Sequence, residues 1–222
     1  MSIRLARMLE PTSDVGRRTA GTELRQACPR LRATAMKERR TPKKTESLAG
    51  QLLLAHPGLR DPNFKRTVIL LSAHSGEGAM GVVLNRPLDK QLGELNSAYA
   101  LGPLAGVPLY GGGPVALEQL VIVSWQWIEP DQTFTLQFGL EPDKANELVG
   151  QPGVTVRAFL GYAGWGEGQL ENELNHDTWL TTPLAGPLVN ETDGVNLWRR
   201  LLVSISPDLR LLANEPDDPA LN

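Results

Sequence analysis

Cysteine, histidine and long apolar runs are all scarce in this chain of 222 residues. The one cysteine, Cys28, excludes an intrachain disulfide framework and is typical of a protein from a reducing compartment, so a cytoplasmic location is expected. No stretch of about 18 consecutive apolar residues occurs, and a membrane-spanning helix is therefore not expected. Residues 1–48 also lack the apolar segment of a secretory signal peptide.

Positive charge is concentrated near the N-terminus. Residues 1–48 contain twelve Lys and Arg against five Asp and Glu, a net charge of +7. Residues 49–222 contain ten against twenty, a net charge of −10. An acidic domain repels nucleic-acid phosphate over most of its surface, and no basic recognition helix is visible in it. Direct DNA binding by residues 49–222 is therefore not expected.

Three interpretations of the basic leader at residues 1–48 stay open. Its apolar residues are few and show no sustained period, which is typical of a disordered arm. Its charge also suits an arm that binds RNA or anionic lipid weakly. Alternatively, translation starts at Met36, which leaves an ordinary short leader. Each interpretation places one folded domain at residues 49–213, followed by a polar tail at residues 214–222.

Short apolar runs bounded by glycine and proline predict the strands of this domain. Strands are expected at residues 49–55, 66–73, 79–85, 107–113, 119–125, 132–139 and 154–161, with an extended segment at 177–183. Helices are expected at residues 88–95, 141–149, 168–177 and 194–205. Because the strands are grouped early and the helices are scattered between them, the pattern indicates an α+β fold rather than a regular βαβ wind.

Templates for cofactor and metal binding are not matched. Four glycines follow the predicted strand at 154–161, but their spacing does not fit G-x-G-x-x-G, and no P-loop is present: Gly161, Gly164, Gly166 and Gly168. The three histidines are far apart and form no His-Glu-x-x-His motif: His56, His74 and His176. Neither a cofactor nor a metal is therefore predicted.

Templates for covalent and acid–base catalysis are not matched either. Residues 49–222 contain no cysteine, and Ser72 and Ser75 do not lie in a Gly-x-Ser-x-Gly motif. Glu171 and Glu173 are two residues apart on a predicted helix, so they point to different faces and do not form a carboxylate pair. These mismatches favour a protein that is not an enzyme.

The glycine-rich stretch "FLGYAGWGEGQLENEL", residues 159–174, predicts a strand–loop–helix corner. Glycine permits close backbone approach and positive φ, while Tyr162 and Trp165 are large rings that must be buried. We expect residues 161–168 to form a loop against the sheet, with Trp165 buried and a helix beginning at Gln169. A positive φ at Gly164 would make Gly164→Val costly.

Several motifs, in order, resemble the bacterial YqgE/AlgH family over about residues 50–198. They are "GAMG" at 78–81, "LNRP" at 84–87, "GGPV" at 112–115 and "GYAGW" with "GQLE" at 161–171. The resemblance implies an α+β fold with a bifurcated, mostly antiparallel sheet curled into a pseudo-barrel with surrounding helices. It implies no established activity, and the family's label as a transcriptional regulator rests on genetic association with alginate control. Trp125 and Trp127 stand where family members usually carry a Leu-His pair.

These motifs predict one binding patch. We expect "LNRP", "GGGPV" and the glycine-rich stretch to meet at one end of the domain and to form a concave polar patch of Asn85, Arg86, Tyr162, Trp165, Gln169 and Glu171. The patch is interpreted as the site of a regulatory module that acts through a protein or small-molecule partner. The alternative is a hydrolase-like enzyme with a polar pocket around His56, His74, Asn85 and Glu171.

Overall fold

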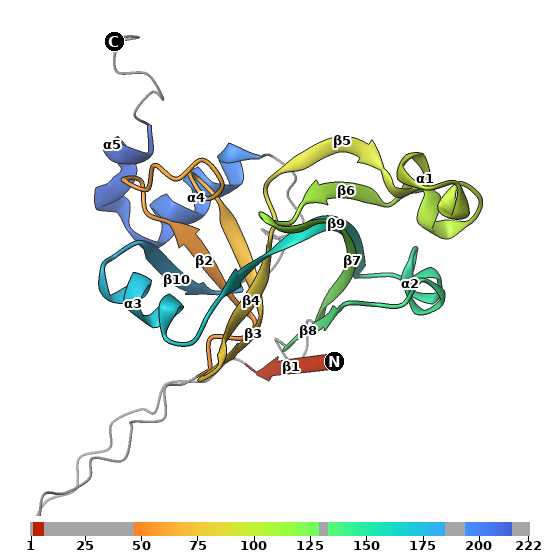
Figure 1. Ribbon diagram of the computed structural model, residues 1–222, viewed down its shortest axis with the longest axis horizontal. Coiled ribbons are helices and arrows are strands. Elements are labelled where there is room, and N and C mark those ends of the chain that lie inside the picture. Colours follow the sequence, from red (N-terminus) through yellow and green to blue (C-terminus); the bar gives the residue numbers. More distant parts are fainter. Residues whose placement is uncertain (1, 7–46, 129–132, 185–193, 215–222) are drawn as a thin grey trace, which may run out of the picture. The chain divides into compact units, whose positions relative to one another are not determined.

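A computed structural model describes residues 2–6, 47–128, 133–184 and 194–214 of the chain (Figure 1). The strands of this part are β1 Ser2–Ala6, β2 Gln51–Ala55, β3 Val68–Ser75, β4 Gly78–Val83, β5 Pro87–Gln91, β6 Pro108–Gly111, β7 Val115–Ile128, β8 Thr133–Phe138, β9 Val154–Trp165 and β10 Trp179–Pro183. Its helices are α1 Leu92–Leu95, η1 Ser97–Tyr99, η2 Pro103–Gly106, α2 Pro142–Leu148, α3 Gln169–Asn175, α4 Val195–Ile205, η4 Pro207–Leu209 and α5 Arg210–Ala213. None of these helices is long and apolar enough to cross a membrane.

The strands join in one open sheet with the order β1-β8-β7-β9-β4-β3-β2-β10. A side branch of β6 and β5 pairs with β9 through β6. The β6–β9 pair is parallel, and the other described pairs are antiparallel. The sheet curls without closing, so the predicted α+β fold with a curled, mostly antiparallel sheet is confirmed.

Strand β9 joins two halves of the sheet. One half contains β1, β8, β7, β6 and β5, and the other contains β4, β3, β2 and β10. The first part of β9 pairs with β7 and β6, and its last three residues pair with β4. Gly161 lies between the two parts with φ 70°, and the register against β7 shifts at this point, between Val115 and Leu120. Because side chains alternate along a strand, this shift reverses which face the later residues occupy. Phe159 accordingly packs in a different core from Ala163.

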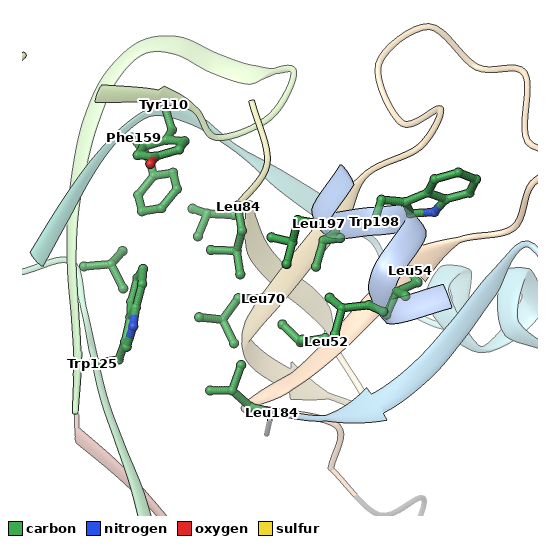
Figure 2. Packing of buried hydrophobic residues seen from close by; sticks show 14 of the residues in the cluster. Leu52, Leu54, Leu70, Leu84, Tyr110, Trp125, Phe159, Leu184, Leu197 and Trp198 are labelled. Carbon is green, nitrogen blue, oxygen red and sulfur yellow. The ribbon is translucent and has the colours of Figure 1, made fainter. Parts of the chain in front are cut away.

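The central core lies between the two halves of the sheet (Figure 2). Leu52, Leu70 and Leu84 of one half face Trp125 and Phe159 of the other. Helix α4 covers this core with four buried apolar side chains, Leu197, Trp198, Leu201 and Leu202. The indole Nε1 of Trp198 donates to the carbonyl of Ala55 at 2.8 Å, which fixes α4 to the end of β2.

Two further cores cover the outer faces of the sheet. The first of these cores lies under α3 and contains Leu53, Leu71, Trp165 and Leu170. The second core lies under α1, η2 and α2 and contains Leu92, Leu104, Leu109, Ile122, Ala145 and Ala158. Neighbouring residues of β3 alternate between the central core and the core under α3, as expected for a strand buried on both faces.

The strand predictions are largely confirmed, but the helix predicted at residues 88–95 is wrong in its first half. Residues Pro87–Gln91 form strand β5, and only Leu92–Leu95 are helical. All five residues of β5 are exposed, so the strand has no buried face that would produce an alternating pattern in the sequence. Its pairing with β6 and the positive φ of Asp89 at the register shift replace the predicted helical turn.

The glycine-rich corner also differs from the prediction. Strand β9 continues to Trp165, so only residues 166–168 form the turn before α3, and the predicted loop of residues 161–168 is wrong in its first part. Pairing of residues 163–165 with β4 keeps this backbone extended, and Gly164 is not among the glycines with positive φ. The buried Trp165 and the helix beginning at Gln169 are confirmed.

Strand β1 was not foreseen in the leader. Residues Ser2–Ala6 pair antiparallel with β8, whose other edge pairs with β7, so the backbone groups of β8 are satisfied on both sides. Residues 7–46 and 215–222 lie outside the described residues. The remaining part of the leader and the polar tail therefore stay predictions.

Candidate functional site

The "LNRP" and "GGGPV" segments meet at the start of the glycine-rich stretch. Val83 N donates to the carbonyl of Gly112 at 2.8 Å, and Gly111 N donates to the carbonyl of Arg86 at 2.9 Å. Gly112 N donates in turn to the carbonyl of Leu160 at 2.7 Å. These bonds confirm that the three segments lie together.

Close approach of two backbones at this junction explains why glycine is needed. A Cβ atom at Gly112 would lie under 3.0 Å from the carbonyl oxygen of Gly161. A Cβ atom at Gly113 would overlap the backbone of Tyr162 and Ala163 in the same way. Because backbone atoms of a paired strand cannot move aside, the glycines here allow β9 to cross the "GGGPV" segment.

Asn85 holds this junction together from inside. Its side chain is 5% exposed, accepts from Val68 N at 2.9 Å, and donates to the carbonyls of Arg66 and Gly194 at 2.9 and 3.1 Å. With both donors and the acceptor engaged, the amide joins β3, the loop before it and the start of α4. Asn85 is therefore a structural residue and presents no free group to a ligand.

Arg86 lies on the outside of the same junction. Its Nη2 donates to the carbonyl of Pro62 at 3.1 Å. Partial burial lowers the pKa of Arg86, and the nearby Asp61 partly opposes this effect. The guanidinium thus ties the loop between β2 and β3 to the end of β4.

Glu173 of α3 accepts hydrogen bonds from three side chains. Its Oε2 accepts from the indole nitrogens of Trp165 at 2.9 Å and Trp179 at 2.7 Å, while its Oε1 accepts from Gln169 at 2.9 Å. The two indole rings pack edge to face at 5.9 Å between centroids, and Phe64 contacts both. One carboxylate therefore joins β9, α3 and β10. Sequence reasoning missed this role, although a buried indole requires an acceptor and Glu173 follows Trp165 closely along the chain.

His74 and Glu171 form a second contact of α3. His74 Nε2 lies 3.0 Å from Glu171 Oε1, and the His74 side chain is 2% exposed. The other ring nitrogen, Nδ1, accepts from Leu48 N at 3.0 Å. Since Nδ1 is an acceptor, the neutral ring carries its proton on Nε2 and donates it to Glu171. Both ring nitrogens are engaged, so this pair fastens the start of the domain and is not arranged as a general base.

The predicted patch is not one surface. Asn85 contacts the first residue of β3, whereas Glu171 contacts His74 near the other end of that strand. Trp165 is buried, and the Gln169 side chain is bonded to Gly166 N and Glu173. The prediction failed because β9 continues past Gly161 as a strand and carries Trp165 and α3 away from "LNRP".

The four residues of the predicted hydrolase pocket, His56, His74, Asn85 and Glu171, do not meet at one site either. Of the four, His74 and Glu171 are in contact. His56 accepts from Gly58 N through Nδ1 at 3.1 Å, in the loop after β2, and Asn85 is fully engaged at the junction. The described residues contain no group of three or more His, Cys, Asp or Glu side chains that could hold a metal ion.

A cavity of about 590 Å³ opens elsewhere, among β7, the turn from β8 into α2, and η1. Its lining residues are Met80, Tyr99, Gln119, Leu120, Val121, Ile122, Phe138, Gly139, Leu140, Glu141, Pro142 and Tyr162. Tyr162 is the one member of the predicted patch that lines it. The other walls come from segments far apart in the sequence and carry no motif, so sequence reasoning had no signal for the cavity.

Arg157 of β9 is buried beside the central core. It is 2% exposed, and its guanidinium carbon lies 4.8 Å from the ring centre of Tyr110 and 5.0 Å from that of Trp125. Its Nη1 has no hydrogen-bond partner among the described residues. Desolvation lowers the pKa of Arg157, and Tyr110 partly opposes this effect. Trp125, one of the two tryptophans that depart from the family pattern, thus supplies an aromatic face to a buried cation.

We expect Arg157→Met to leave the free energy of unfolding within about 1 kcal/mol of the wild-type value or to raise it. Methionine fills similar space without a buried charge, and removing an incompletely bonded buried ion is often neutral or stabilising. Arg157→Ala leaves a cavity and should cost about 3 kcal/mol. Urea denaturation of the three proteins measures the difference. Equal losses for both variants would contradict this assignment and indicate a charge that the fold requires.

Taken together, these features define an α+β domain built on an open, curled, mostly antiparallel sheet that is buried on both faces. The sequence model of the AlgH-like family matches residues 52–210, and the chain belongs to this family.

Relatives and solved structures agree with this assignment. A UPF0301 protein of Streptomyces coelicolor is 37% identical over 81% of this chain and 97% of its own length. A UPF0301 protein of Hahella chejuensis is 39% identical over 66% of this chain and 82% of its own length. The solution structure of the AlgH protein of Pseudomonas aeruginosa matches with a TM-score of 0.56 and 26% identity, covering 80% of this chain and 99% of that one. The crystal structure of protein DIP2367 of Corynebacterium diphtheriae has the same fold, with a TM-score of 0.56 and 24% identity, covering 75% of this chain and 91% of that one.

Proposed function

We propose that this domain is a regulatory binding module and that the cavity among β7, the β8–α2 turn and η1 is its ligand site. The main support for this proposal is the size of the cavity. Its volume of about 590 Å³ lies in the range of roughly 300–1,000 Å³ that is usual for small-molecule sites. Apolar and polar groups contribute about equally to its lining surface, the polar ones from residues such as Tyr99, Gln119, Glu141 and Tyr162.

The arrangement of the polar residues supports binding over catalysis. His74 has both ring nitrogens engaged, one by a backbone N–H and one by Glu171. A general base needs a free nitrogen within reach of the proton that it removes. The hydrolase alternative would therefore require His74 to give up a bond that fastens the start of the domain. The acidic charge of residues 49–222 favours a protein or small-molecule partner over DNA.

Fragment binding followed by NMR tests the proposed site. In ¹⁵N-labelled protein, we expect fragments to shift the amide signals of Tyr99, Leu120, Phe138 and Tyr162. Gln119→Trp introduces a large side chain at an exposed lining position and should weaken binding at least about tenfold, equivalent to about 1.4 kcal/mol. Gln91→Trp, at an exposed position of β5 that does not line the cavity, is the matched control and should bind as the wild type does.

Two outcomes would overturn the proposal. Fragments whose signals gather at other residues and that bind Gln119→Trp unchanged would remove the cavity from consideration. Hydrolysis of a substrate in a broad activity screen, lost in Glu171→Gln with the fold intact, would support the hydrolase instead.

A further inference from the structure

Among the described residues, one charged side chain lines the cavity, the carboxylate of Glu141. No described Lys, Arg or His side chain lines it. An anionic ligand such as a nucleotide would meet no cation in this lining, and its phosphates would be repelled.

The Glu141 carboxylate is free to accept a ligand. Glu141 is the N-cap residue of α2, but its side chain makes no capping hydrogen bond, and it has no other partner among the described residues. The nearest lysine along the helix, Lys144, is already bonded to Glu147 at 2.7 Å. The negative charge at Glu141 is therefore not neutralised by its own helix.

Aromatic side chains complete the same cavity. Tyr99, Phe138 and Tyr162 line it together with the polarisable thioether of Met80. Aromatic faces attract organic cations, by about 0.5–1 kcal/mol at exposed sites and more where water is excluded. A cavity lined by a carboxylate and by aromatic side chains suits an ammonium or guanidinium group attached to an apolar body.

We infer that the cavity selects small organic cations with an apolar body, and that Glu141 provides the charge selectivity. This inference rests on the proposed function, because it specifies the ligand class of the same site. The volume accommodates a ring with a short side chain and a charged head. Glu141 would distinguish this ligand from neutral or anionic molecules of similar size by its cationic head.

Three probes of matched shape test the inference: 2-phenylethylammonium, 2-phenylethanol and 3-phenylpropionate. In NMR titrations of the full chain, the ammonium should bind with the lowest Kd, at least about tenfold below that of the carboxylate, a difference of about 1.4 kcal/mol. Added salt should raise the Kd of the ammonium and leave that of the alcohol unchanged.

Glu141→Gln separates charge from shape. This variant should weaken binding of the ammonium about fivefold to tenfold and leave the alcohol unaffected. Glu147→Gln is the matched control, because it removes a carboxylate of the same helix that is already paired with Lys144 and does not line the cavity. It should bind all three probes as the wild type does.

The failure of this inference is distinct from the failure of the proposed function. If the alcohol or other neutral fragments bind in the cavity but the ammonium does not bind better, the charge selectivity is wrong and the binding module stands. The charge selectivity is equally wrong if Glu141→Gln changes nothing. If no probe or fragment binds in the cavity, both proposals are wrong.

Discussion

Gly113→Ala should lower the free energy of unfolding by about 3 kcal/mol or more. Gly113 has φ 153°, a region that L residues rarely adopt, and its added Cβ would overlap backbone atoms of Tyr162 and Ala163. The strain of the dihedral and the overlap with a paired strand each cost on the order of 1–3 kcal/mol. Urea denaturation followed by circular dichroism measures the loss.

Gly164→Ala, in the part of β9 that lies against Gly113, is the matched control. Its φ is not positive, and the nearest atom to an added Cβ is the Cε2 of Tyr162 at 3.4 Å, an ordinary van der Waals contact. We expect a change of less than about 1 kcal/mol, because only the ring of Tyr162 must adjust. If Gly113→Ala were as stable as Gly164→Ala, the explanation of the glycines by backbone crossing would be wrong.

Glu173→Ala should cost about 3 kcal/mol. It removes the acceptor of two buried indole N–H groups and of the Gln169 amide, and hydrogen bonds to a charged group contribute about 1.5–3 kcal/mol each. Because Glu173 is only partly buried, water replaces some of these bonds and keeps the loss below their sum. Denaturation followed by tryptophan fluorescence measures both the loss and the changed surroundings of the indoles.

Glu167→Ala tests whether any acidic residue of this corner would have the same effect. Glu167 lies in the exposed turn before α3 and should change stability by less than about 0.5 kcal/mol. Equal stability of the two variants would mean that the Trp165 and Trp179 indoles do not depend on Glu173.

Much of the fold could be predicted because it depends on local pattern. The hairpin of β3 and β4 follows from two apolar runs around a glycine turn, and α4 follows from an apolar stripe of helical period. Strand β5 could not be predicted, since its exposed residues carry no period and its extended form depends on pairing with β6. The backbone conformation of Gly164 could not be predicted either, because it is determined by pairing with β4.

The site was less predictable than the fold for a physical reason. His74 and Glu171 were both identified as candidates, but their bonding to Leu48 and to each other depends on how α3 lies on the sheet. Arg157 lies within the strand predicted at residues 154–161, and nothing in the sequence indicates that Tyr110 and Trp125 lie beside it. The cavity walls come from β4, β7, β8, β9, η1 and the start of α2, so no local pattern describes them.

The pairing of β2 with β10 has a consequence for how the chain folds during synthesis. Leu53 pairs with Thr181, which is made 128 residues later. At about 5–20 residues per second, the ribosome needs on the order of ten seconds to supply this partner. Over that interval an apolar strand keeps one edge without its partner, and an unpaired edge is a template for aggregation. Productive folding is therefore expected to be late and slow, and a nascent chain halted before β10 should be a preferred substrate for chaperones.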